Sequence, residues 1–231
     1  MLALSETWIS ADAPPAIKLA IAPTGYSVLH VHTFTLLQIV PGGPTRSGGL
    51  AVIHRDGLVV RNFNQLSQAK TSTFELQLVT VRTGSKSIVV ANIYRPPNST
   101  SPLRHFFDEL TDVIANILAS TSNQLVIVGD VNCPGTQPTS VNLDLVSVLD
   151  VFCLTQLVPG PTQDNNLLDI VLIKKDGFIV EEVQVDDAGC LSDHRLVLVQ
   201  LRIGWRRQTS VTFKYRRACI VVVHQSGGER G

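Results

Sequence analysis

The stretch from Leu125 to Asn132 restricts the fold of this chain more than any other. Four apolar residues, three of them β-branched, run directly into a glycine, Asp130, a valine and Asn132. An apolar run that ends at a turn residue predicts a fully buried strand. Chemistry in open α/β sheets gathers outside the carboxyl ends of such strands, although Asp and Asn also favour turns for local reasons. Two residues apart on an extended chain, Asp130 and Asn132 are expected to project to the same side.

The composition indicates a single globular domain with no strong overall charge. Of 231 residues 44% are apolar, and 19 basic side chains balance 19 acidic ones. This excludes wholesale disorder and argues against a protein that coats nucleic acid by charge alone. No signal sequence and no apolar run of membrane-spanning length is present, so we expect an intracellular protein. The cysteines lack the spacing of a zinc site or a disulfide framework; they are Cys133, Cys153, Cys190 and Cys219.

Periodicity predicts many strands and two helices. Beyond a short strand before Glu6, the expected strands are Gly25 to Phe34, Leu50 to His54, Phe74 to Val81, Ser87 to Tyr94, Leu125 to Asp130, Leu167 to Ile173, Ile179 to Val185 and Leu196 to Leu201. One helix follows the N-cap candidate Ser101, and a second spans about Val141 to Phe152. Glu75 and Gln77 alternate with apolar residues, which predicts a strand with one solvent-exposed face. Two packed sheets flanked by helices fit this order.

Polar residues stand at the ends of several expected strands. Glu6 follows the first one, and Tyr94 ends another immediately before two prolines. Each has a plain structural interpretation, as surface decoration or packing. Asp169 is harder to dismiss because its neighbours are all apolar, and a buried carboxylate is costly unless it is paired or binds a metal. His194, in Ser192-Asp193-His194, is its expected partner.

Six short motifs follow one another along the chain. They are Leu4-Ser5-Glu6-Thr7-Trp8, Gly48-Gly49-Leu50-Ala51-Val52, Asn92-Ile93-Tyr94-Arg95-Pro96-Pro97, Val128-Gly129-Asp130-Val131-Asn132, Leu168-Asp169-Ile170-Val171-Leu172 and Ser192-Asp193-His194. In this order they resemble the endonuclease/exonuclease/phosphatase superfamily, and most of all the endonuclease domain of non-LTR (LINE-type) retrotransposons. The resemblance covers residues 1–203. In residues 204–231, the basic Phe213-Lys214-Tyr215-Arg216-Arg217 resembles the linker that follows this domain in such polyproteins, and a disordered C-terminal tail is expected after it.

The resemblance implies a four-layer α/β/β/α sandwich of two mixed sheets with a site at their shared edge. It also implies that water hydrolyses a phosphodiester of DNA with Mg²⁺ or Mn²⁺, in the nucleus and with a reverse transcriptase domain downstream. Glu6 would then be a metal ligand with Asp193 near the metal, and Tyr94 would bind the phosphate. Asp130 would orient or deprotonate the water, and Asn132 would donate to the phosphoryl oxygens. His194, oriented by Asp169, would contact the phosphate or act as acid–base partner; which group is the base stays open.

The chain departs from this family at its beginning. Members start with a strand that ends in Asn, followed by a helix, and this sequence starts at the next strand. We therefore expect an N-terminally truncated domain that lacks a central strand and has exposed sheet edges there. Two alternatives stay open. One is a catalytically inactive remnant with residual nucleic-acid binding, and the other is a phosphatase of the same superfamily.

Overall fold

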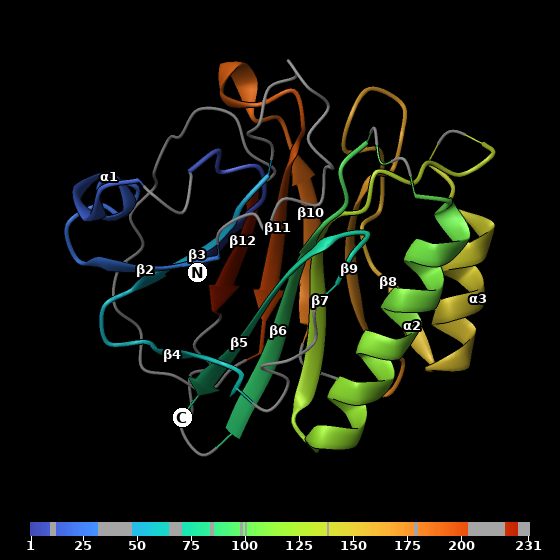
Figure 1. Ribbon diagram of the computed structural model, residues 1–231, viewed down its shortest axis with the longest axis horizontal. Coiled ribbons are helices and arrows are strands. Elements are labelled where there is room, and N and C mark those ends of the chain that lie inside the picture. The colour runs from blue at the N-terminus through green and yellow to red at the C-terminus, as the bar shows by residue number, and fades with distance from the viewer. Residues whose placement is uncertain are drawn as a thin grey trace, which may run out of the picture.

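Two six-stranded sheets form the centre of the protein, as a computed structural model shows (Figure 1). The structure describes residues 1–9, 13–31, 48–64, 71–83, 86–97, 99, 101–137, 139–177, 180–202 and 220–225. The elements are β1 (Leu2–Leu4), α1 (Pro15–Ala20), β2 (Tyr26–Val31), β3 (Leu50–Arg55), β4 (Val59–Asn62), β5 (Glu75–Thr83), β6 (Lys86–Tyr94), α2 (Leu103–Ser120), β7 (Gln124–Asp130), α3 (Leu143–Val151), β8 (Leu154–Gln156), β9 (Asp169–Lys174), β10 (Val180–Asp186), a 3₁₀ turn (Gly189–Leu191), β11 (Leu196–Leu201) and β12 (Ile220–Gln225).

Each sheet mixes parallel and antiparallel neighbours. The first sheet has the order β10-β11-β12-β1-β3-β2, and the second has the order β4-β5-β6-β7-β9-β8. In the second sheet β6 and β7 are parallel, whereas β7 and β9 are antiparallel. The carboxyl ends of β6 and β7 therefore meet the start of β9 at one edge of this sheet.

The helices α2 and α3 cover the outer face of the second sheet (Figure 1). The predicted 3.6-residue period of α2 is confirmed, because Phe106, Leu110 and Ile114 are buried in the core beneath it. Its N-cap is Pro102 rather than Ser101. The helix α3 begins after Asn142, whose side chain accepts a hydrogen bond from Asp144 N at 2.9 Å. Burial of these apolar stripes holds both helices on the sheet.

A second core fills the space between the two sheets. It consists mainly of β-branched side chains from both inner faces, among them Val52, Val79, Val90, Val126, Val171 and Val197. The second sheet is thus covered on both faces, which corrects the prediction that Glu75 and Gln77 face solvent. Gln77 is only 1% exposed, and its Nε2 donates to Leu29 O of the first sheet at 2.9 Å. Polar and apolar residues do alternate along β5, but the polar side chains point toward the first sheet and not toward solvent.

On the outer face of the first sheet, Ile21 and Ala22 directly after α1 contact the group Leu4, Ala51 and Ile53. With α1 on this side and α2 and α3 on the other, the predicted α/β sandwich is confirmed (Figure 1). In the described part of the chain no helix is long and apolar enough to cross a membrane.

The strand β12 differs from the sequence expectation. Its residues fall within the segment assigned to linker and tail, yet β12 lies between β11 and β1. It pairs parallel with β11 from Leu196↔Ile220 onward and antiparallel with β1 from Leu2↔Val222 onward. The exposed edges expected beside β1 are therefore absent, because β1 is paired on both sides. The β-branched run Ile220-Val221-Val222-Val223 suits a strand. The basic segment Phe213 to Arg217 and the tail from Ser226 lie outside the described residues.

Candidate active site

A row of four polar side chains crosses the second sheet at one edge. The strand registers align Glu75 with Tyr94, Tyr94 with Asp130, and Asp130 with Asp169. Residues in register project to the same face of a sheet. All four are buried, and they share the face that carries Gln77 and Asn92, whose side chains donate to carbonyls of the first sheet. The row therefore faces the first sheet.

The sequence from Asp130 to Asn132 forms a tight, hydrogen-bonded turn. Asn132 has φ +46°, so the chain is not extended there as predicted. Its backbone N donates to Asp130 Oδ1 at 2.9 Å, and its Nδ2 donates to Asp130 Oδ2 at 2.7 Å and to Arg95 O at 2.8 Å. Arg95 Nη1 donates in return to Asn132 O at 3.2 Å. Both amide hydrogens of Asn132 are thus directed at protein oxygens, which fixes the Asp130 carboxylate.

His194 lies between two carboxylates. Its Nδ1 is 2.8 Å from Asp169 Oδ2, and its Nε2 is 4.0 Å from Asp130 Oδ2. Because a carboxylate only accepts, the proton of this short hydrogen bond is on Nδ1. The pairing of Asp169 with His194, expected from sequence, is therefore present, and β7, β9 and the start of β11 bring the three side chains together.

The buried Thr162 holds the backbone next to both Asp169 and His194. Thr162 Oγ1 accepts from Leu168 N at 3.1 Å and from Asp169 N at 3.0 Å, and its carbonyl accepts from Arg195 N at 2.6 Å. It therefore contacts the backbone on both sides of the Asp169–His194 bond. The sequence analysis missed Thr162, because a threonine in a turn before a strand carries no distinctive signal. It also missed Arg95, whose guanidinium lies 5.6 Å from the centre of the Phe106 ring.

Burial and mutual charge shift the ionisation of these groups. Burial and then the charge of Asp169 raise the pKa of Asp130 well above its ordinary value, against the opposing effects of His194 and the Asn132 amide. Burial alone lowers the pKa of His194, but the hydrogen bond and charge of Asp169, followed by the charges of Asp130 and Asp193, raise it to about 9. His194 is consequently an imidazolium at neutral pH, and Asp130 holds a proton more tightly than an ordinary carboxyl.

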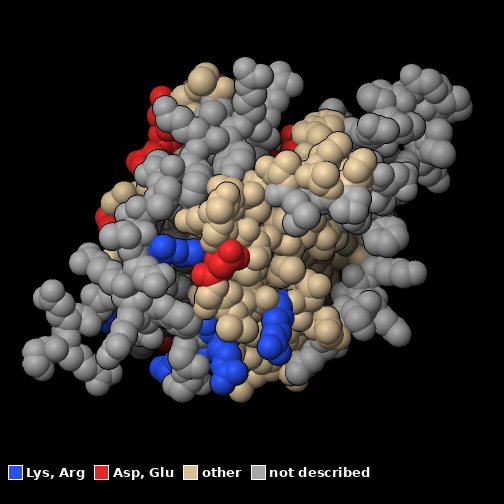
Figure 2. All heavy atoms as spheres, turned by 90° about the vertical axis from the view of Figure 1, so that its left-hand side faces the viewer, with Lys and Arg blue, Asp and Glu red and all other residues tan. Residues whose placement is uncertain are grey.

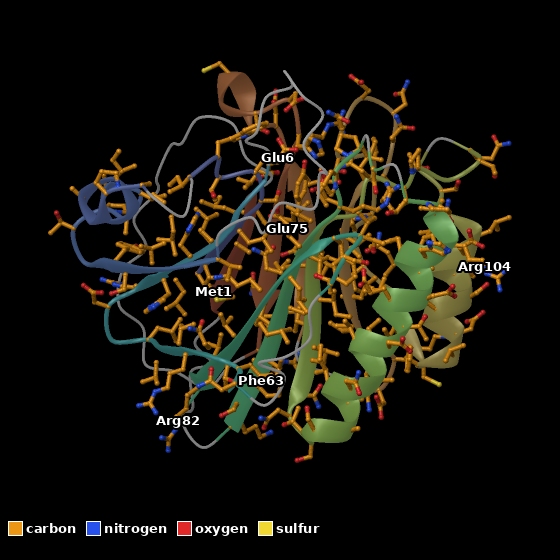
Figure 3. All side chains as sticks on the ribbon, viewed as in Figure 1. Met1, Glu6, Phe63, Glu75, Arg82 and Arg104 are labelled. Carbon is orange, nitrogen blue, oxygen red and sulfur yellow. The ribbon has the colours of Figure 1, made fainter. Side chains whose placement is uncertain are left out.

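Glu6 and Tyr94 meet at the same edge. The Tyr94 hydroxyl donates to Glu6 Oε1, which joins the end of β1 to the end of β6. Burial and then this hydrogen bond raise the pKa of Tyr94, so the phenol stays protonated as a donor. Figure 3 shows Glu6 at the upper end of the molecule, above Glu75. The charge of Glu6 also acts on Asp130, which places both carboxylates in one electrostatic environment.

Two other residues lie apart from this cluster. Asp193 is exposed and accepts from Gln163 Nε2 at 3.1 Å, so it affects His194 by charge rather than by contact. Cys133 is buried, its Sγ lies 3.0 Å from Val131 O, and burial raises the pKa of its thiol to about 11. A thiol in this state is a poor nucleophile.

The donor set fits a divalent cation. One ligand atom each of Asp130, Asp169 and His194 lies within 4.8 Å of the other two. Carboxylate oxygens such as those of Asp130 and Asp169 suit Mg²⁺ and Mn²⁺, whereas His194 in its protonated form is a neighbour of the cation and not a ligand. Burial is the main reason that the pKa of Asp130 is raised, and the negative charges of Asp169 and Glu6 add to it; a bound cation would offset the part that these charges contribute. Glu6 provides a further carboxylate at this edge.

Comparisons with known proteins found one matching family and several solved structures with a similar fold. Residues 88–198 match the family described as endonuclease-reverse transcriptase. The endonuclease domain of TRAS1, a telomere-specific non-LTR retrotransposon, has 20% identity and a TM-score of 0.53 over 74% of this chain and 77% of that one. The AP endonuclease LMAP from Leishmania major has 11% identity and a TM-score of 0.56, over 80% and 73%. The TDP2 protein of D. rerio, solved with a single strand DNA product, has 11% identity and a TM-score of 0.54, over 84% and 82%. No curated protein matches the chain.

The similar solved structures establish the fold of the chain. It is an α/β sandwich similar to those of the TRAS1 endonuclease domain, the Leishmania major AP endonuclease and the D. rerio TDP2. More narrowly, the chain's segment 88–198, which carries Tyr94, Asp130, Asn132, Asp169 and His194, matches the endonuclease-reverse transcriptase family. The resemblance inferred from the six motifs is confirmed.

Proposed function

We propose that this protein is a metal-dependent phosphodiester hydrolase that nicks DNA. The proposal is carried by one observation: Asp130, Asp169 and His194 converge within 4.8 Å, at the edge where Tyr94 binds Glu6. No simple structural need accounts for two buried carboxylates and a partly buried histidine so close together, because burial of charge is costly. Perturbed pKa values at such a cluster are typical of catalytic sites.

Each residue has a role that its own contacts support. Asp130, held by two hydrogen bonds from Asn132, orients the attacking water and accepts its proton, for which its raised pKa is suited. Asn132 positions Asp130, a role its contacts favour over donation to the phosphoryl oxygens. His194 is charged at neutral pH, so it stabilises negative charge on the phosphate and supplies a proton.

Glu6, with Asp130 and Asp169 nearby, would hold Mg²⁺ or Mn²⁺. When bound, such a cation neutralises phosphoryl charge as a Lewis acid. Tyr94 keeps the Glu6 carboxylate in place by donating its hydroxyl hydrogen to Glu6 Oε1. The exposed Asp193 would act on the site by charge.

DNA is the proposed substrate because the similar proteins act on or bind it. Their names describe a retrotransposon endonuclease, an AP endonuclease and a protein in complex with single strand DNA product. The family matched by residues 88–198 is named for a linked reverse transcriptase, so a reverse transcriptase partner and nuclear action belong to the same proposal.

A plasmid-nicking assay with Mg²⁺ tests the proposal. We expect the parent chain to convert supercoiled DNA to open circles. Replacing Asp130→Asn or His194→Ala should slow nicking by at least about 100-fold, because each removes a proton-transfer or charge-stabilising group. Asp150→Asn, on the exposed side of α3, is the matched control and should nick like the parent.

The outcomes separate the alternatives. A folded parent that nicks no DNA with Mg²⁺ or Mn²⁺ contradicts the proposal and favours the inactive remnant. If the same parent hydrolyses a small phosphate monoester, it acts as a phosphatase instead. Nicking that survives both site substitutions would indicate a contaminating nuclease.

A further inference from the structure

Glu75 is the member of the polar row that the proposed mechanism does not use. It begins β5, in register with Tyr94, and is only 7% exposed. Its Oε2 accepts a hydrogen bond from Gly49 N at 2.7 Å. Burial of a carboxylate at this depth is costly unless hydrogen bonds compensate it, so the segment that donates to Glu75 is informative.

Glu75 holds the turn formed by Gly48 and Gly49. Gly48 has φ +102°, and a Cβ on it would lie 2.1 Å from Glu75 Oε1. The carboxylate is therefore packed directly against this glycine. Only a residue without a side chain allows both the backbone conformation and the close approach.

The same turn holds the segment that carries Glu6. Thr7 N donates to Gly49 O at 3.1 Å, and Trp8 N donates to Gly48 O at 2.9 Å. Hydrogen bonds therefore run without interruption from the Glu75 carboxylate through the two glycines to the residues that follow Glu6. Thr7 is held a second time by His30 of β2, its Oγ1 lying 2.8 Å from His30 Nε2.

The Glu6 segment needs such support because its backbone is strained. Glu6 has φ +53° and Trp8 has φ +55°, values that cost non-glycine residues energy. Strained conformations persist only where the surroundings determine them fully. The side chain of Glu6 is fixed by Tyr94, and the backbone after it is fixed through the glycine turn.

We propose that Glu75 is a positioning residue for Glu6: it sets the backbone from which Glu6 reaches a divalent cation. The inference rests on the proposed function in so far as Glu6 is a metal ligand. Residues that orient metal ligands typically contribute about 10- to 100-fold to metal affinity. Glu75 is thus expected to affect metal binding without touching the metal.

Metal binding and hydrogen exchange test this assignment together. Mn²⁺ affinity is measured by electron paramagnetic resonance for the parent, Glu75→Leu and Glu75→Gln. Leucine removes the acceptor for Gly49 N, so Mn²⁺ affinity should fall about tenfold. Glutamine keeps an acceptor oxygen and should restore most of the affinity. Glu109→Leu is the control, since the Glu109 carboxylate accepts the backbone amides of Ser72 and Thr73, which lead into β5, and not that of the glycine turn beside residues 5–9.

Hydrogen exchange of residues 5–9 keeps the test decisive if Mn²⁺ does not bind or if Glu75→Leu does not fold. Exchange at the Thr7 and Trp8 amides should be faster in Glu75→Gln than in the parent, because a neutral acceptor holds Gly49 less firmly. Exchange in β6 should be unchanged. A parent that binds no Mn²⁺ contradicts the metal proposal alone. Unchanged exchange at Thr7 and Trp8, or a folded Glu75→Leu with the parent's Mn²⁺ affinity, overturns the role of Glu75.

Discussion

A histidine between two carboxylates sets the electrostatics of the site. His194 bonds to Asp169 at 2.8 Å and faces Asp130 at 4.0 Å, and the pKa of His194 rises to about 9 in spite of its burial. The imidazolium in turn opposes the rise of the Asp130 pKa. The cluster thus holds a positive charge between two acidic groups, and loss of that charge would leave buried carboxylates uncompensated.

The stability of the protein should therefore depend on pH through His194. The pKa is about 9 in the folded state and near 6.5 when unfolded, so the folded state binds the proton more tightly. This contribution to the free energy of unfolding is fully present below about pH 6.5 and is lost as the pH rises to 9. Its upper limit is about 3 kcal/mol. Urea denaturation in metal-free buffer between pH 6 and 9.5 measures it.

The comparison with two variants identifies the residue responsible. His194→Gln should lose most of the decline in stability between pH 6.5 and 9. His105→Gln, at an exposed position of α2, should keep it. An equal decline in the parent and in His194→Gln would show that another group causes it.

At the scale of elements, β12 joins the two parts of the first sheet. Its six residues pair with β11, and three of them also pair with β1 on the other side. Glu6 follows β1 and His194 precedes β11, so both neighbours of β12 lead to the site. Without β12, these two strands would each have an unpaired edge facing the other.

Two shortened chains test the role of β12. A chain that ends at residue 219 lacks the strand, and one that ends at residue 225 keeps it. We expect the shorter chain to lose several kcal/mol of unfolding free energy, because a central strand that pairs with both β11 and β1 is removed. The longer one should match the parent in thermal denaturation. Equal melting temperatures for the two shortened chains would contradict this role.

At the scale of the whole molecule, the described charges on one face are unevenly placed, although the net charge of the chain is zero. Figure 2 shows Lys and Arg side chains gathered toward the lower end of one face, and Figure 3 places Arg82 at that end, away from Glu6. Arg82 lies seven positions after Glu75 along β5, which corresponds to about 23 Å. This exceeds the screening length of about 8 Å at physiological salt.

Reversing charge at the two ends should have unequal effects on DNA. Arg195, exposed directly after His194, lies beside the site, so Arg195→Glu should weaken DNA binding and make it less dependent on salt. Arg82→Glu changes the net charge equally but should leave binding close to that of the parent. Binding of a short labelled duplex at several salt concentrations measures both. Equal loss in the two variants would point to overall charge rather than to a local site.

Much of the fold and site is local in the sequence and was predictable. The period of α2, the buried strand before Asp130 and the partnership of Asp169 with His194 all follow from residues close together or from the cost of burying a charge. The prediction that Glu75 and Gln77 lie on a solvent-exposed face was wrong. Alternation of polar and apolar residues shows that the two faces of a strand differ, but not whether a face contacts solvent or another sheet. Thr162 had no signal in the sequence, since the partners that connect it to the site, Asp169 and Arg195, lie seven and thirty-three residues away.

The sequence by itself therefore determined the class of fold, the strand ends at which polar side chains gather, and the resemblance to retrotransposon endonucleases. Only the tertiary structure decided that Glu75 joins the row beside Tyr94, that Asn132 turns back onto Asp130, and that β12 fills the gap between β11 and β1. The physical reason is the distance along the chain over which each interaction acts. Periodicity and burial act along one segment, whereas strand register and inter-sheet hydrogen bonds are set by partners that the chain meets only when it folds.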